Sequence, residues 1–200
     1  MKLSYPVKPW IVTQAHGIKN PSYNQFGFSE HNGVDVALGT DGKIYAPCDL
    51  EVLEIGFNNG AGNYVRLFSP EKLTVDGIQC YVGIMAMHLL RATCKEGQKL
   101  KIGDEIGFAG NTGFSTGPHT HFTFRRYSKK VWNKKFQLDT DKEADHTFDP
   151  SPYWTGKYAV DNSQPMGVSY EEALANLRKS LPKGFILSTA EWLLRRKYGK

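Results

Sequence analysis

Cysteine is scarce in this sequence of 200 residues. Only Cys48, Cys80 and Cys94 occur, and no two of them have C-x-x-C spacing. An odd number of unpaired positions excludes a disulfide framework and a cysteine-rich metal knuckle. We therefore expect three free thiols, with Cys48 as a small buried side chain rather than a nucleophile.

Long apolar runs are also missing. No stretch approaches the ~18 apolar residues of a membrane span, so we expect no transmembrane segment. The opening MKLSYPVKPW lacks the apolar centre of a secretory signal. We therefore expect synthesis in the cytoplasm without a signal peptide.

Neither positive nor negative residues are in large excess. The formal net charge is +5, and most of the excess lies in residues 127–200. A modest basic balance favours solubility and could also favour anionic polymers such as those of a bacterial wall. No DNA- or RNA-binding motif accompanies it, so nucleic acid is not an expected partner.

What the sequence does contain is a succession of short strand-like segments. Between residues 34 and 124, apolar runs alternate with turn signals such as Asn58-Asn59-Gly60 and Asp76-Gly77. No helical period interrupts them, which favours a mainly β domain with an antiparallel sheet. The expected strands cover residues 34–38, 43–47, 50–56, 63–68, 78–85, 99–110 and 119–124.

The pattern changes after Arg126. Residues 128–147 are polar and charged, and residues 148–154 are typical of a loop that packs aromatic side chains. Ser169 and Glu172 form a capping-box pattern at the start of an apolar period, which predicts a helix over 169–180.

Two parts follow from this pattern. Residues 1–127 are expected to form one domain, including an N-terminal lead-in. Residues 128–200 are expected to form a basic loop and a helical C-terminal extension packed on that domain, with a second helix after residue 188.

Two histidine motifs carry candidate chemistry. His31 and Asp35 flank Gly33 in H-N-G-V-D, and His119 and His121 lie in H-T-H within an expected strand. Side chains at i and i+2 of a strand share a face, so both imidazoles can reach one site. Each motif alone could be a surface or hydrogen-bonded histidine. Together they favour a catalytic zinc site, which needs three nitrogen or oxygen ligands and an open fourth position.

The order of motifs resembles the lysostaphin-type peptidoglycan endopeptidases, which have the duplicated hybrid motif fold. The matching block covers about residues 28–125, and N-T-G-F-S-T-G-P-H-T-H-F is its most diagnostic part. The matching elements are His31–Asp35, Tyr45–Pro47, Gly62–Val65, Met87–Leu89, Glu96–Gly107 and Asn111–Phe122.

This resemblance implies a zinc metalloendopeptidase that cuts the peptide crosslinks of bacterial peptidoglycan. It places the zinc ligands at His31, Asp35 and His121. It makes His88 and His119 two further active-site histidines that handle protons, and either could be the general base. A monomer is expected.

The family resemblance implies an active-site groove across the sheet, and two departures from the family pattern concern the walls of this groove. Ala86 stands where family members often have tyrosine, and residues 68–84 look like an extended hairpin. Either could alter which crosslink is preferred, a glycine bridge or a direct D-alanyl–diamino-acid bond.

Other readings stay open. The chain could be a non-catalytic peptidoglycan-binding relative or a structural component of a virion. Lack of an export signal fits a phage-encoded lysin or virion-associated enzyme acting at the bacterial cell wall, and it also fits a chain trimmed of its leader.

Overall fold

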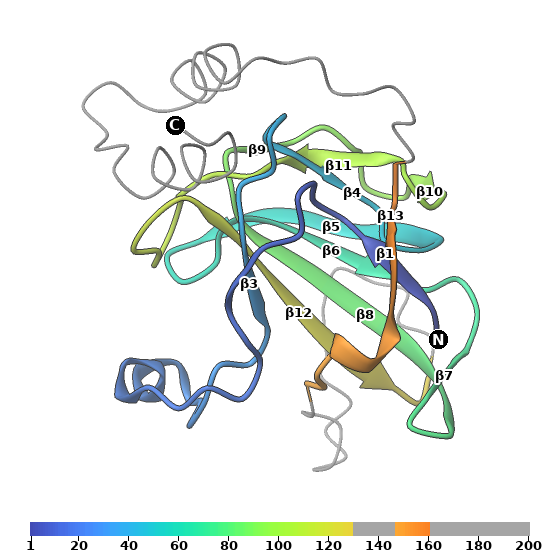
Figure 1. The fold of residues 1–200 in the computed structure, drawn as a ribbon, viewed down its shortest axis with the longest axis horizontal. Coiled ribbons are helices and arrows are strands. Elements are labelled where there is room, and N and C mark those ends of the chain that lie inside the picture. Colours follow the sequence, from blue (N-terminus) through green and yellow to red (C-terminus); the bar gives the residue numbers. More distant parts are fainter. Residues whose placement is uncertain (130–146, 161–200) are drawn as a thin grey trace.

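The computed structural model describes residues 1–129 and 147–160 (Figure 1). The described chain is mainly β, as predicted, and its two helices are short 3₁₀ helices. The elements in order are β1 (Leu3–Tyr5), β2 (Val12–Gln14), η1 (Pro21–Phe26), β3 (Val34–Ala37), β4 (Lys43–Tyr45), β5 (Leu50–Asn58), β6 (Gly62–Phe68), β7 (Leu73–Val75), β8 (Ile78–Leu89), β9 (Arg91–Ala92), β10 (Lys99–Leu100), β11 (Glu105–Phe108), β12 (His119–Tyr127), η2 (Ser151–Tyr153) and β13 (Trp154–Tyr158).

The main sheet has the order β10-β5-β6-β8-β12-β3-β2, with β7 paired to β8. Every pairing in it is antiparallel. Its longest strand is β8 with 12 residues, and β5 and β12 follow with 9 residues each. On β12, Phe122 and Phe124 are fully buried on the core face, whereas His119 and His121 occupy the other face. The long central strands therefore carry the core on one side and the candidate site on the other.

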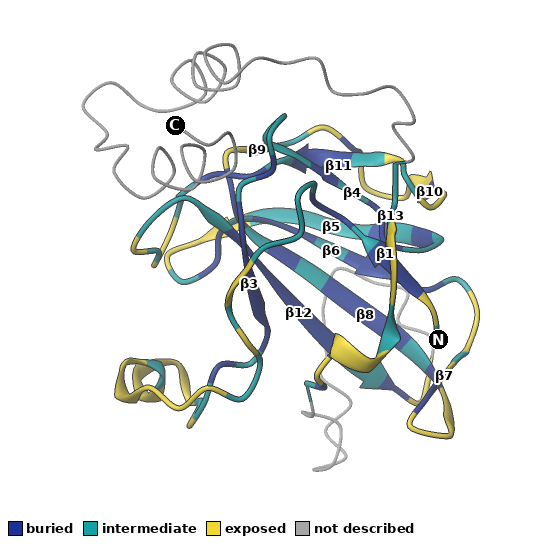
Figure 2. Ribbon diagram, in the orientation of Figure 1, coloured by how far each residue is buried: buried dark blue, intermediate teal, exposed yellow. Residues whose placement is uncertain are grey.

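Two small sheets complete the core. One has the order β4-β11-β9, and the other pairs β1 with β13 in parallel. Burial follows the central strands, whereas η1 and the tip of the β7–β8 hairpin are exposed (Figure 2). Leu3, Ile44, Ile106 and Phe122 lie at the centre of one hydrophobic cluster.

The expected strand over residues 99–110 is wrong, because a turn divides it into β10 and β11. Asp104 N–H donates to the Lys101 carbonyl at 2.9 Å, and the Asp104 carboxylate accepts from Lys101 N–H at 2.8 Å. Gly103 supplies the positive φ of +90° that this turn requires. Ile102 lies in this turn and is 50% exposed, although it is apolar.

The expected extended hairpin is present as β7 and β8. Its two-residue turn is Asp76-Gly77, with φ angles of 50° and 78°. Positive φ at both central positions is typical of the turn that matches the twist of paired strands.

Residues 147–160 contact the N-terminal part of the chain. Phe148 belongs to the core cluster, and Leu3 in β1 pairs with Trp154 in β13. The expected helix over 169–180 and the second one after residue 188 lie outside the described residues, and the domain division at residue 127 stays a prediction. Within residues 1–129 and 147–160, no helix has the length and apolar character of a membrane span.

Candidate metal centre

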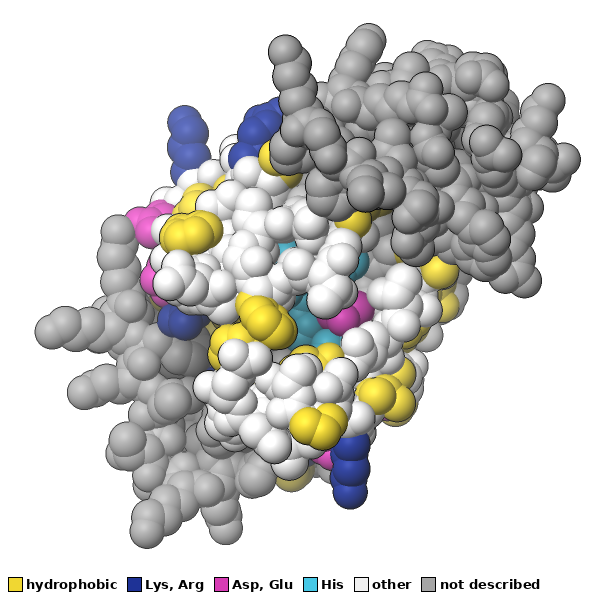
Figure 3. Space-filling model, turned by 90° about the vertical axis from the view of Figure 1, so that its left-hand side faces the viewer, with side chains coloured by type: hydrophobic (Ala, Val, Ile, Leu, Met, Phe, Trp, Pro, Cys, Tyr) yellow, Lys and Arg dark blue, Asp and Glu magenta, His cyan; other side chains and the backbone are white. Residues whose placement is uncertain are grey.

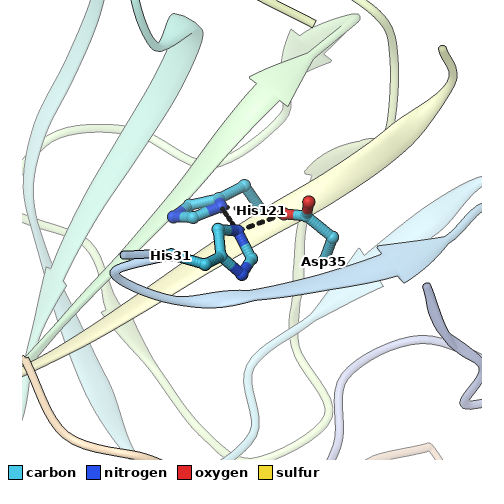
Figure 4. Close-up of side chains that lie close together, drawn as sticks. All are labelled: His31, Asp35 and His121. Carbon is cyan, nitrogen blue, oxygen red and sulfur yellow. Dashed lines mark hydrogen bonds and ion pairs between the residues drawn. The ribbon is translucent and has the colours of Figure 1, made fainter. Parts of the chain in front are cut away.

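Three potential ligand atoms converge on the face of β12 opposite the core (Figure 4). His31 Nε2 lies 3.1 Å from Asp35 Oδ1 and 3.0 Å from His121 Nδ1. His121 Nδ1 lies 2.8 Å from the same Asp35 oxygen. All three residues are buried. The prediction that H-N-G-V-D and H-T-H meet in space is therefore confirmed by the structure.

Strand pairing brings these residues together. His121 on β12 stands directly opposite Asp35 on β3, so their side chains share one face of the sheet. His31 precedes β3 by three residues and reaches the same point from a loop. Gly33 allows this approach, because a Cβ there would lie 2.4 Å from the Phe122 carbonyl oxygen and 2.5 Å from His121 Nε2.

Hydrogen bonds on the outer side of each ring decide which nitrogen faces the centre. His31 Nδ1 lies 2.8 Å from the Ala15 carbonyl oxygen, which can only accept, so Nδ1 carries the proton and Nε2 presents a lone pair. His121 Nε2 lies 2.9 Å from Thr123 Oγ1, and a hydroxyl can donate or accept. His121 can therefore present either a proton or a lone pair to Asp35.

The donor set fits a zinc ion. Each short contact among the three ligand atoms needs either a proton or a cation between lone pairs. A proton on His121 Nδ1 can point toward Asp35 Oδ1 or His31 Nε2, but it leaves the 3.1 Å contact between His31 Nε2 and Asp35 Oδ1 without a proton. A cation held by all three atoms would satisfy every contact. Two imidazoles and one carboxylate are ligands that suit zinc, and ligating histidines commonly donate their other N–H to a carbonyl or hydroxyl.

Two more histidines border the centre. His88 lies with its ring centroid 4.9 Å from that of His119 and 6.2 Å from that of His121. His88 Nδ1 donates to the Thr112 carbonyl at 2.8 Å, and His119 Nδ1 donates to the Gly117 carbonyl at 2.7 Å. In each neutral ring Nε2 is consequently left as a lone pair. His119 Nε2 lies 3.6 Å from Asp35 Oδ1.

An irregularity in β8 turns His88 toward the site. Alternation would place His88 on the face of Ala86, whereas Met87 is the residue opposite His121. Between the pairs Val65–Ala86 and Asn63–Leu89, β8 advances one residue more than β6, which makes a bulge. His88 lies within it at a φ of 62°, uncommon for a residue other than glycine.

The Thr112 side chain holds this bulge. Its hydroxyl donates to the Leu89 carbonyl at 2.9 Å and accepts from Asn63 N–H at 2.9 Å. The Asn63 amide in turn donates to the carbonyls of Leu89 and Leu90, each at 3.1 Å. Asn63 and Thr112 therefore support His88 indirectly.

Burial and hydrogen bonding together determine the protonation of the centre. Burial, followed by the nearby His119, lowers the pKa of His88 to about 4. Burial also lowers the pKa of His121. For Asp35, burial raises the pKa, but hydrogen bonding with His121 and His31 outweighs it and holds the pKa well below its usual range. The carboxylate is therefore ionised and the His88 ring is neutral near pH 7.

The family model described as Peptidase family M23 matches residues 29–133, more than half of the chain. The chain belongs to peptidase family M23. The predicted resemblance to lysostaphin-type peptidases is therefore confirmed. The matched segment contains all five histidine and aspartate residues described above.

The curated relatives include proteins whose names describe them as endopeptidases of glycyl-glycine bonds or of peptidoglycan. The glycyl-glycine endopeptidase ALE-1 of Staphylococcus capitis is 37% identical over 46% of this chain and 24% of its own length. The peptidoglycan DD-endopeptidase ShyA of Vibrio cholerae is 35% identical over 46% of this chain and 19% of its own length. The chain thus spans about a quarter or less of the length of these relatives.

Solved structures share the M23 fold. The catalytic domain of lysostaphin from Staphylococcus simulans superposes with a TM-score of 0.54 and 26% identity, covering 72% of this chain and 91% of that domain. A zinc-containing peptidase from Vibrio cholerae gives 0.51 and 29%, covering 66% of this chain and 39% of that one. The predicted fold class is confirmed.

Sequence reasoning missed the residues around the five. Tyr23 stacks on the His31 ring with centroids 5.5 Å apart, and Gln14 donates to its hydroxyl. Ser115 Oγ lies 3.2 Å from His119 Nδ1. Only Ser115 lies within a recognised motif, and no spacing in the sequence connects Tyr23 or Gln14 with the site. His16 is not one of the converging residues, and its Nε2 lies 3.0 Å from Thr147 Oγ1.

Proposed function

We propose that this chain is a zinc metalloendopeptidase that hydrolyses peptide crosslinks of bacterial peptidoglycan. The observation that carries the proposal is the convergence of His31 Nε2, Asp35 Oδ1 and His121 Nδ1 within 2.8–3.1 Å of one another. Relatives named as glycyl-glycine and DD-endopeptidases support the substrate class.

His31, Asp35 and His121 would hold the zinc ion. A bound zinc ion supplies a Lewis acid that polarises the scissile carbonyl and lowers the pKa of a water molecule toward neutrality. The side chains of His119 and Asp35 are 16% and 13% exposed, so substrate and water can reach the centre from one side. That open side is what a catalytic site requires and a closed structural site lacks.

His88 and His119 would handle the protons of the reaction. Each ring is fixed by a carbonyl at Nδ1, which leaves Nε2 as the ring nitrogen that can act on the substrate. The low pKa of His88 keeps its ring neutral at pH 7, so Nε2 can accept a proton. His119 Nε2 has the same free lone pair and lies nearer to Asp35. Either ring could be the general base, and the other would then bind the oxygen on which charge develops.

Zinc content measured beside hydrolysis of purified walls tests these roles. The variants His31→Ala, Asp35→Ala and His121→Ala should lose most of the zinc. His88→Ala and His119→Ala should keep the zinc and lose hydrolysis by about 10²–10⁴-fold. His16→Gln is the matched control, because it removes a histidine outside the centre and should change neither quantity.

Specific outcomes would overturn parts of the proposal. If His119→Ala abolished zinc binding and His121→Ala retained it, the ligand assignment within H-T-H would be reversed. If a zinc-loaded chain released no muropeptides from any wall, a non-catalytic relative would become the better reading. Full activity in all five variants would contradict the peptidase proposal itself.

A further inference from the structure

Two exposed phenylalanines meet beside the metal centre. Phe26, at the end of η1, is 40% exposed, and Phe114, in the loop between β11 and β12, is 46% exposed. Their ring centroids lie 5.0 Å apart, and the rings are tilted edge to face by 65°. We call Phe26 and Phe114 the aromatic bridge, because they join two loops that are distant in sequence.

Each of the two loops also holds a histidine of the site. Tyr23 in η1 stacks on His31. On the other side, the carbonyls of Thr112 and Gly117, which flank Phe114 in sequence, accept the Nδ1 protons of His88 and His119. The aromatic bridge therefore spans two walls of the same site.

A third loop fixes the position of the bridge. Phe114 N–H donates to the Gly60 carbonyl at 3.0 Å, at the tip of the β5–β6 hairpin. A Cβ built on Gly60 would lie 3.5 Å from Phe26 Cε1, an ordinary van der Waals distance, so the Phe26 ring lies close to this tip. Figure 3 shows histidine and acidic side chains at the bottom of a hollow, with hydrophobic side chains directly beside it.

The chemistry of this rim favours one class of crosslink. An exposed apolar rim gains free energy only from a partner with apolar surface to bury. A glycine bridge has no side chains to offer. A direct D-alanyl–diamino-acid crosslink offers a methyl group and a chain of methylenes next to the scissile bond. Similarity to relatives does not decide between them, because the glycyl-glycine and DD-endopeptidases are 37% and 35% identical to this chain.

We propose that Phe26 and Phe114 determine specificity by packing on aliphatic groups of the crosslink, so that the chain prefers direct D-alanyl–diamino-acid crosslinks to glycine bridges. This inference rests on the proposed function. The bridge takes no part in proton transfer or in metal binding, so its loss should change the choice of substrate and leave the zinc content intact.

The test compares two purified walls, one with direct D-alanyl–diamino-acid crosslinks and one with glycine bridges. The wild-type chain should release muropeptides faster from the first. Phe26→Ala/Phe114→Ala should lower kcat/KM on the first wall by about tenfold and leave the second nearly unchanged, since only the first loses an apolar contact. Phe26→Leu/Phe114→Leu should restore most of the rate by restoring apolar surface.

Ile78→Ala is the matched control. Ile78 is 56% exposed and starts β8, ten residues before His88. This substitution therefore removes an exposed apolar side chain far from the site. Equal or faster cleavage of glycine bridges by the wild-type chain would overturn the inference and leave the proposed function intact. An unchanged ratio of the two rates in the double alanine variant would do the same. No cleavage of either wall by a zinc-loaded chain would overturn both.

Discussion

Adding one methyl group at Gly33 should disturb both the sheet and the metal centre. The new Cβ would lie 2.4 Å from the Phe122 carbonyl oxygen and 2.5 Å and 2.8 Å from His121 Nε2 and Cε1. Phe122 is the partner of Val34 in the β3–β12 pairing, so its carbonyl cannot withdraw without loosening that pairing. The His121 ring is the part that can move, and it must move by roughly 1 Å to reach an ordinary contact distance.

The size of the effect follows from these distances. Overpacking of this kind costs about 1–3 kcal/mol of unfolding free energy. For a chain of this length, each kcal/mol lowers Tm by about 2–4 °C, so Gly33→Ala should melt about 2–12 °C lower. Metal sites require ligand distances within about 0.2 Å of the ideal, so displacing His121 should also weaken zinc binding by about 10–100-fold.

Thermal melting in the presence of chelator measures the first effect, and competition with a zinc indicator measures the second. Gly117→Ala is the matched control, because no atom lies within 4 Å of a Cβ built there and its neighbour His119 also borders the site. Gly117→Ala should behave like the wild type in both assays. If Gly33→Ala had the same Tm and the same zinc affinity as Gly117→Ala, the packing argument would be refuted.

Three further predictions concern protons and thiols. Thr123→Val should weaken zinc binding by about tenfold in the same indicator assay, because a zinc-bound His121 would need the Thr123 hydroxyl to accept its Nε2 proton; Thr123→Ser should retain the affinity, and equal affinities for valine and serine would contradict this. Urea denaturation of the metal-free chain should show that the free energy of unfolding decreases as the pH falls from 6.5 toward about 4, because burial and His119 lower the pKa of His88 and only the unfolded chain then binds a proton on this ring. His88→Gln should flatten this pH dependence, and a steeper pH dependence in that variant would contradict the prediction. Alkylation at pH 8 should be slow in the folded chain, since burial raises the pKa of Cys48 to about 12 and raises those of Cys80 and Cys94; three thiols should react after denaturation without reductant, and a single reactive thiol would indicate an intramolecular disulfide and contradict this.

The sequence predicts the part of the fold that depends on local patterns. Alternating apolar residues and turn dipeptides predicted most strands of the main sheet, and Asp76-Gly77 predicted the turn of the long hairpin. The same local reasoning failed at residues 99–110. There Gly103 and Asp104 make a turn inside a segment in which the spacing of Leu100, Ile102 and Ile106 had suggested one continuous strand.

Part of the candidate metal centre was predictable, because His119 and His121 follow the two-residue period of a strand. His119 and His121 share a face whatever the register of their neighbours. His88 is different, because simple alternation along β8 would direct it to the core with Ala86. The direction of the His88 side chain depends on a bulge where β8 pairs with β6. Because β6 lies more than twenty residues away in sequence, the local pattern around His88 does not reveal this bulge. Only the family resemblance predicted His88.

The same contrast explains the rim of the site. Tyr23 and Phe26 lie in η1, where no residue is buried and no apolar period exists. Tyr23 is fixed by its contact with His31, which lies outside η1, and Phe26 by its contact with Phe114, which is remote in sequence. Residues of this kind determine which substrate is bound, and for that reason family membership alone leaves the crosslink open.

The hydrogen bonds around the centre also show how the His121 ring can adapt to the presence or absence of a metal ion. His31 has no choice of tautomer, because the Ala15 carbonyl requires a proton on Nδ1. His121 does have a choice, because the Thr123 hydroxyl can donate to Nε2 or accept from it. Without metal, a proton on His121 Nδ1 can bind Asp35. With a cation present, that proton is no longer needed there, and rotation of the Thr123 hydroxyl lets Nε2 carry it instead. The buried carboxylate therefore has an N–H donor as its partner in one state and a cation in the other, and neither state leaves a polar atom of the buried His121 ring unsatisfied.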